Sequence, residues 1–78
     1  MNTKIFTFLE KNLKNSFNLP KYQKIFDTIS ADTVVHDLPW TPARYSKFKD
    51  AVTAELQLDC DYVGTLRDIV ADLSERYT

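Results

Sequence analysis

Residues 39–56 read Pro-Trp-Thr-Pro-Ala-Arg-Tyr-Ser-Lys-Phe-Lys-Asp-Ala-Val-Thr-Ala-Glu-Leu, and they carry a well-defined helical pattern. Thr41 is of a type that caps helix N-termini, and Pro42 suits the first helical position, where an N–H would have no partner in any case. Apolar side chains then recur at three- and four-residue spacing, at Tyr45, Phe48, Val52 and Leu56. The pattern predicts an amphipathic helix over 42–56.

The flanking segments show the same periodicity. Residues 3–17 predict a first helix with Thr3 as its N-cap, ended before Pro20. Residues 21–30 predict a short helix or a helical loop. Thr65 with Asp68 resembles a capping box that opens a last helix reaching about residue 76. No segment has a pattern typical of a strand. We therefore expect an all-α, four-helix bundle of three main helices plus one short helix.

Length and composition bound the chain to one domain over residues 1–78. Hydrophobic residues make up 44% and aromatic residues 13%, which is more than disordered chains contain. Cys60 is the only cysteine, so no internal disulfide can form, and we expect it to be buried. No apolar run has membrane length and no signal peptide is evident, so the expected location is the cytoplasm, without a membrane partner.

Three landmarks with matched spacing resemble the acyl carrier protein family. The stretch Asp32-Thr33-Val34-Val35-His36-Asp37-Leu38 is similar to the end of the long loop of that family, and the distance from there to Leu56 matches without a gap. Val63-Gly64-Thr65-Leu66 is similar to the run that opens its closing helix. The resemblance covers residues 4–77. It implies a carrier-like helical fold. The segment 57–64, where the family has a short third helix, is shorter here, so we expect only a turn.

The attachment serine of the family is missing. Where carriers have Asp-Ser-Leu, this chain has Thr41-Pro42-Ala43, and Pro42 offers no hydroxyl for phosphopantetheine. Ser46, the nearest serine, lies about 6 Å further along the helix axis and is a poor attachment site. The resemblance therefore implies a carrier-like domain without a phosphopantetheine arm. Arg44 and Lys47 also replace the acidic surface on which carrier partners dock.

No catalytic or metal-binding set can be assembled from the sequence. His36 is the only histidine and has no second ligand nearby in the chain. The acidic residues of the last third lack the spacing of a calcium loop and predict a solvated face: they are Asp59, Asp61, Asp68 and Asp72. We expect neither enzymatic activity nor a cofactor or metal.

Trp40 stands between two prolines, where a prosthetic arm would otherwise emerge, and tryptophan is common both in cores and at interaction hot spots. If Trp40 is exposed, it, Arg44 and Lys47 form a docking surface for another protein, which the resemblance places among enzymes of acyl or related metabolism. The alternative is a small helical adaptor or regulator unrelated to carriers. A helix-turn-helix that binds DNA is disfavoured, because the net charge is −1 and residues 65–76 are acidic on balance.

Overall fold

The computed structural model describes the backbone of residues 2–77 and the side chains of residues 2–76. Four α-helices are present there: α1 (Thr3–Ser16), α2 (Gln23–Thr28), α3 (Pro42–Leu56) and α4 (Leu66–Tyr77). Two short 3₁₀ turns, η1 (Pro20–Tyr22) and η2 (Val35–Asp37), lie in the connection between α1 and α3. The described residues form no strand, only an isolated bridge between Val34 and Thr65. The expectation of an all-α bundle with three main helices and one short helix is confirmed.

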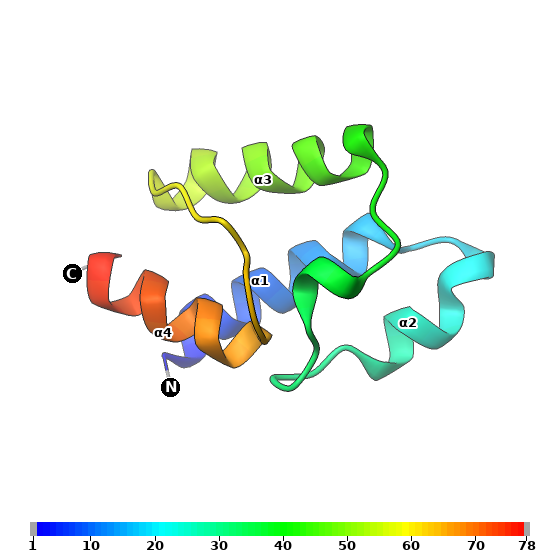
Figure 1. The fold of residues 1–78 in the computed structure, drawn as a ribbon, viewed down its shortest axis with the longest axis horizontal. Helices are drawn as coiled ribbons and strands as arrows, with labels where there is room; N and C mark the ends of the chain where they lie inside the picture. Colours follow the sequence, from blue (N-terminus) through cyan, green and yellow to red (C-terminus); the bar gives the residue numbers. More distant parts are fainter. Residues whose placement is uncertain (1, 78) are drawn as a thin grey trace.

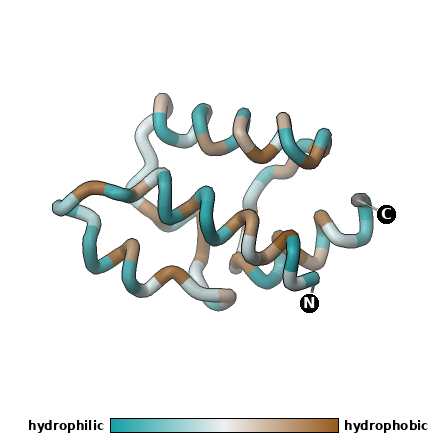
Figure 2. The backbone as a smooth tube through the Cα atoms, turned by 180° about the vertical axis from the view of Figure 1, so that it is seen from behind, coloured by the Kyte–Doolittle hydropathy of each residue, from teal (hydrophilic) through white to brown (hydrophobic). Residues whose placement is uncertain are grey.

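Helix α1 is the central element, because α3 and α4 both pack against it. Both of these helices run opposite to α1, and the connection carrying α2 returns across the bundle before α3 begins (Figure 1). Hydrophobic residues recur along each helix at the spacing of a turn (Figure 2). The helical core consists of Ile5, Leu9 and Leu13 from α1, Phe48, Val52 and Leu56 from α3, and Leu66, Ile69, Val70 and Leu73 from α4.

The helix starts were predicted with one error. Thr41 caps α3 through its hydroxyl, which accepts the Arg44 N–H at 3.2 Å, and Pro42 occupies the first turn as expected. The cap of α1 is Asn2 rather than Thr3: its side-chain oxygen accepts the Ile5 N–H at 3.2 Å, while Thr3 is already helical. Asparagine caps at least as well as threonine, so the helix begins one residue earlier.

The connection between α1 and α3 is held on the start of α4 by its backbone. The N–H groups of Leu66 and Arg67 donate to the carbonyls of Thr33 and Ala31 at 2.8 and 2.9 Å, and the Val35 N–H donates to Gly64 at 3.2 Å. These bonds satisfy donors that a helix N-terminus leaves without intrahelical partners. The other connection, residues 57–64, contains no helix, so the turn expected there is absent. None of the helices of residues 2–77 is long and apolar enough to cross a membrane.

Candidate functional site

The start of α3 carries the position where the resemblance places an attachment serine. Pro42 is exposed in the first turn of the helix, and Ser46 is exposed about one turn further along. The hydroxyl of Thr41 is engaged as the N-cap, so it serves the backbone of α3. The exposed hydroxyl nearest to the start of the helix is therefore Ser46, displaced along the axis as the sequence predicts.

Trp40 does not present a free ring to solvent. Its indole N–H donates to the Val35 carbonyl at 2.8 Å, and its ring centroid lies 4.9, 5.2 and 5.4 Å from those of Phe17, Phe48 and Tyr45. The half-buried side chain thereby joins the end of α1, the connection and α3. Trp40 is therefore not an exposed residue at the centre of a docking surface. Three neighbouring aromatic rings pack against the ring that a partner would have to contact.

Arg44 is likewise engaged with aromatic rings. Its guanidinium carbon lies 5.0 Å from the ring centroid of Tyr22 and 5.5 Å from that of Phe17, and Nη1 is 3.4 Å from the Tyr22 hydroxyl. These cation–π contacts pack η1 against α3 and leave the charge without a counterion. Lys47 is exposed on the next turn. Trp40 and Arg44 are both engaged with aromatic rings. Lys47, the third residue expected to bind a partner, makes no aromatic contact, hydrogen bond or ion pair with the described residues.

A groove runs between the end of α1 and the first half of α3, and we call it the α1–α3 groove. Arg44, Lys47, Ala43 and Ala51 line its α3 side, and Asn12, Asn15, Ser16, Asn18 and Leu19 line the other. Leu19 is 44% exposed, which makes it one of two large hydrophobic side chains exposed among the described residues. The groove thus combines an exposed apolar side chain, amide groups and two cations.

The α1 side of this groove was missed at the level of sequence, although a signal was present. Asn12, Asn15 and Asn18 recur every three residues along one face of the chain. Asparagine is a weak helix former, so helix propensity does not explain Asn12 and Asn15 within α1. Only Asn12 is committed internally, through a 2.8 Å bond from its amide to the Phe8 carbonyl.

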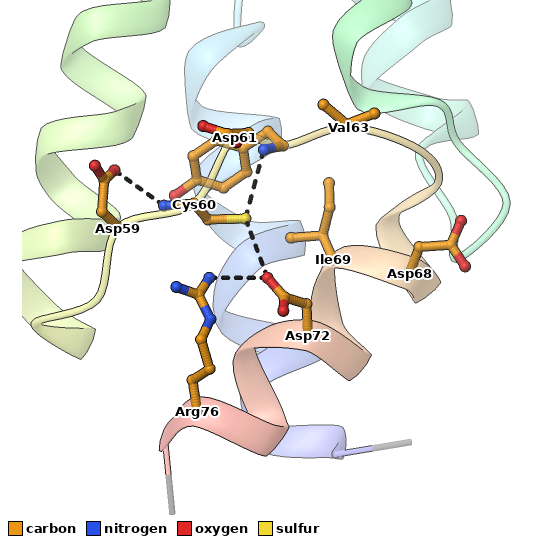
Figure 3. Close-up of a pocket in the computed structure, with 9 residues that line it drawn as sticks. Asp59, Cys60, Asp61, Val63, Asp68, Ile69, Asp72 and Arg76 are labelled. Carbon is orange, nitrogen blue, oxygen red and sulfur yellow. Dashed lines mark hydrogen bonds and ion pairs between the residues drawn. The ribbon is translucent and has the colours of Figure 1, made fainter.

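A second hollow lies between residues 59–63 and α4, at the opposite end of α3 (Figure 3). Cys60 is buried there as expected, and its Sγ accepts the Tyr62 N–H at 3.4 Å and lies 4.0 Å from an Asp72 oxygen. Asp72 also forms an ion pair with Arg76 at 2.8 Å. The thiol is therefore packed against its own loop, and the carboxylate beside it has a cationic partner.

Tyr62 is the most confined polar side chain of the described residues. Its ring is 1% exposed and stacks edge-on against Phe48 at 5.1 Å, and its hydroxyl is buried without a hydrogen-bond partner. Its backbone adopts a left-handed φ of 54°, which bulky residues rarely adopt. Burial raises the pKa of the Tyr62 hydroxyl, because the charged form would lose its hydration.

The single histidine of the chain, His36, lies in η2, in the connection between α1 and α3. His36 lies 3.5 Å from the carboxylate of its neighbour Asp37, and both are exposed. Among residues 2–77 no group of three or more histidine, cysteine or carboxylate side chains is arranged to hold a metal ion.

Comparison of the chain with protein-family models, curated proteins and solved structures finds no match. The likeness to acyl carrier proteins therefore rests on the residue pattern described above.

Proposed function

We propose that this chain is a non-catalytic, cytoplasmic protein-binding domain related to acyl carrier proteins, which works without a phosphopantetheine arm. The observation that carries the proposal is the start of α3. Thr41 and Pro42 form the helix start where the resemblance places an attachment serine, and the α1–α3 groove lies beside it. A surface that carriers use to present an arm is thereby available for direct contact with a partner protein, such as an enzyme of acyl or related metabolism.

The arrangement of the helices supports a carrier-like origin. The long connection, with its two 3₁₀ turns and α2, delivers Asp37 and Leu38 to the start of α3, and Leu38 packs against the core. The alternative is a helical adaptor that arrived independently at the same order of elements. DNA binding has less support, because Arg67 and Arg76 of α4 are already paired with Asp32 and Asp72, at 2.6 and 2.8 Å.

The carrier origin is tested by restoring the attachment motif. The unaltered chain and a variant with Thr41→Asp, Pro42→Ser and Ala43→Leu are incubated with coenzyme A and a broad-specificity phosphopantetheinyl transferase, and intact masses are compared. We expect the arm on the variant alone, because all three positions are exposed and substitution leaves the core untouched. A folded variant that stays unmodified would favour the independent adaptor, and modification of the unaltered chain would end the proposal of an arm-free domain.

Protein binding is tested by site-specific photocrosslinking in cells. A photoreactive side chain replaces Ala51, which lines the α1–α3 groove, or Lys24, which is exposed on α2 outside it. We expect Ala51 to give a discrete crosslinked protein that Lys24 does not give. If neither position yields one, the proposed protein-binding function is wrong.

A further inference from the structure

The first turns of α3 carry charge of the sign that a helix start disfavours. The N-terminus of a helix has partial positive charge and prefers carboxylates, at about 0.3–1 kcal/mol each. The first turn of α3 contains no acidic residue, and Arg44 and Lys47 follow instead. The positive end of the helix dipole and two cations are thus concentrated beside the α1–α3 groove, at a cost to local stability.

Within the described residues, no carboxylate forms an ion pair with the cations at this end of the groove. Lys21 lies 5.0 Å from the centroid of the same Tyr22 ring that Arg44 contacts, so a third cation adjoins the pair. Among residues 2–77, lysine and arginine side chains form ion pairs only where Lys49, Arg67 and Arg76 meet Asp59, Asp32 and Asp72. The cations of the groove are therefore available to an external anion.

The groove also offers a non-ionic contact surface. Ala43 and Ala51 lie two turns apart on the exposed side of α3, and their small side chains allow another backbone to approach closely. Leu19 lines the other wall of the groove and is 44% exposed. A groove between two antiparallel helices suits an amphipathic helix, whose apolar residues would contact Leu19 and whose acidic residues would contact Lys47 and Arg44.

We propose that the α1–α3 groove binds an acidic amphipathic helical segment of a partner protein. The inference rests on the proposed protein-binding function and adds the chemistry of the partner. Complementary charge accelerates such an encounter and rejects basic segments. A nucleic acid is the less favoured polyanion, because the chain carries a net charge of −1 and the groove presents an apolar side chain and amides.

The test is selection from a displayed library of random 16-residue peptides on the purified protein. We expect enriched peptides to carry a net negative charge and apolar residues spaced by three or four. Lys47→Glu should lower the affinity of the best peptide about tenfold or more, as reversal of a contacting charge does, and Lys24→Glu should leave it within about twofold. Raising the salt from 50 to 300 mM should weaken binding by the unaltered protein more than binding by the Lys47→Glu variant.

Three outcomes would overturn the inference. They are enrichment of neutral or basic peptides, absence of any enrichment above the Lys47→Glu background, and tighter binding of a 20-nucleotide single-stranded DNA than of the best peptide. These three outcomes can be distinguished from a failure of the proposed protein-binding function. A protein crosslinked at Ala51, combined with non-acidic selected peptides, would retain protein binding and remove only the assignment of an acidic partner.

Discussion

The side chain of Trp40 joins three parts of the chain, and its removal should be costly. Trp40→Ala should lower the free energy of unfolding by about 3–5 kcal/mol, because it leaves a cavity between Phe17, Tyr45 and Phe48. Trp40→Phe keeps an aromatic ring but removes the bond to Val35, and should cost about 1–2 kcal/mol. Chemical denaturation measures both. An unchanged midpoint for Trp40→Ala would show that the ring is not part of the core.

The hydroxyl of Tyr62 should destabilise the folded protein. It is buried without a partner, so folding removes its hydration and returns no hydrogen bond. Tyr62→Phe should therefore raise the free energy of unfolding, by about 1 kcal/mol, while keeping the ring stacked on Phe48. The control is Tyr45→Phe, because the Tyr45 side chain is only half-buried. We expect its change in the free energy of unfolding to be smaller than about 1 kcal/mol in either direction. A loss of stability in Tyr62→Phe would mean that the hydroxyl has a partner.

The same hydroxyl makes a specific prediction for alkaline solution. Burial raises the pKa of Tyr62 in the folded protein above the value of about 10 that it has in the unfolded chain. Above that value the unfolded chain releases the proton first, so stability falls as the pH rises. The difference in unfolding free energy between Tyr62→Phe and the unaltered protein should thus be constant below pH 9 and widen above pH 10. Denaturation series at several pH values would measure it, and a constant difference would contradict the raised pKa.

The role of a single residue is predictable from the sequence where its cause is local. The role of Thr41 was predictable because a cap and its partner lie three residues apart. The surroundings of Trp40 were not, because its ring partners Phe17 and Phe48 come from different helices. Arg44 is a similar case, since its contact with Tyr22 bridges 22 positions in the chain.

Among the helices, α4 has a start that is fixed by residues close to it in the sequence. Thr65 and Asp68 form the predicted capping box, in which each side chain accepts the backbone N–H of the other at 3.2 Å. Gly64 precedes it with a φ of +92°, and a Cβ built there would lie 2.9 Å from an Asp68 oxygen. The glycine is therefore required by its conformation and by the closeness of the cap.

Two substitutions with opposite expected effects on the free energy of unfolding test the backbone of the 57–64 connection. Gly64→Ala should lower the free energy of unfolding by about 1–3 kcal/mol, since it forces a side chain into a left-handed conformation beside Asp68. Gln57→Gly should raise it by up to about 1 kcal/mol, because Gln57 ends α3 with an exposed side chain at a φ of 55°. Thermal unfolding of both variants gives the comparison. Equal shifts of the same sign would contradict this account of backbone strain.

The existence of the main helices was predictable, whereas the connections were not. The periodic stripes of α1, α3 and α4 follow from short-range spacing that any single sequence displays. Residues 57–64 have no periodicity, and Tyr62 is fixed there by contact with Phe48 of α3. The groove is of the same kind, because its two walls, one from the end of α1 with the residues after it and one from α3, come together only when these helices pack antiparallel.

At the scale of the whole molecule, charge is divided along the chain. Residues 11–47 contain six lysines and arginines against three aspartates, whereas residues 48–77 contain three against seven aspartates and glutamates. The start of α3 and the neighbouring η1 belong to the first group, and α4 with the 57–64 connection belongs to the second. These regions lie toward opposite ends of the molecule (Figure 1). A nearly neutral net charge therefore conceals two surfaces suited to different partners.

Because positive charge gathers at the start of α3, an added carboxylate there should raise the stability of the fold and weaken the binding of an acidic peptide. Ala43→Glu places a carboxylate in the exposed first turn of α3, where it complements the helix dipole, so it should raise the free energy of unfolding by about 0.3–1 kcal/mol. The same charge lines the α1–α3 groove and should weaken the best acidic peptide about tenfold. Denaturation and peptide titration measure the two effects on one preparation.

Ala54→Glu is the matched control for that substitution. It adds the same side chain to an exposed position in the last turn of α3, outside the groove lining. There a carboxylate opposes the dipole, so stability should fall slightly while peptide affinity stays within about twofold. If Ala43→Glu and Ala54→Glu changed affinity equally, binding would follow total charge and the groove would have no special part in it. A weaker affinity for Ala43→Glu alone, in a more stable protein, would mean that the positive start of α3 is retained for binding at the expense of the fold.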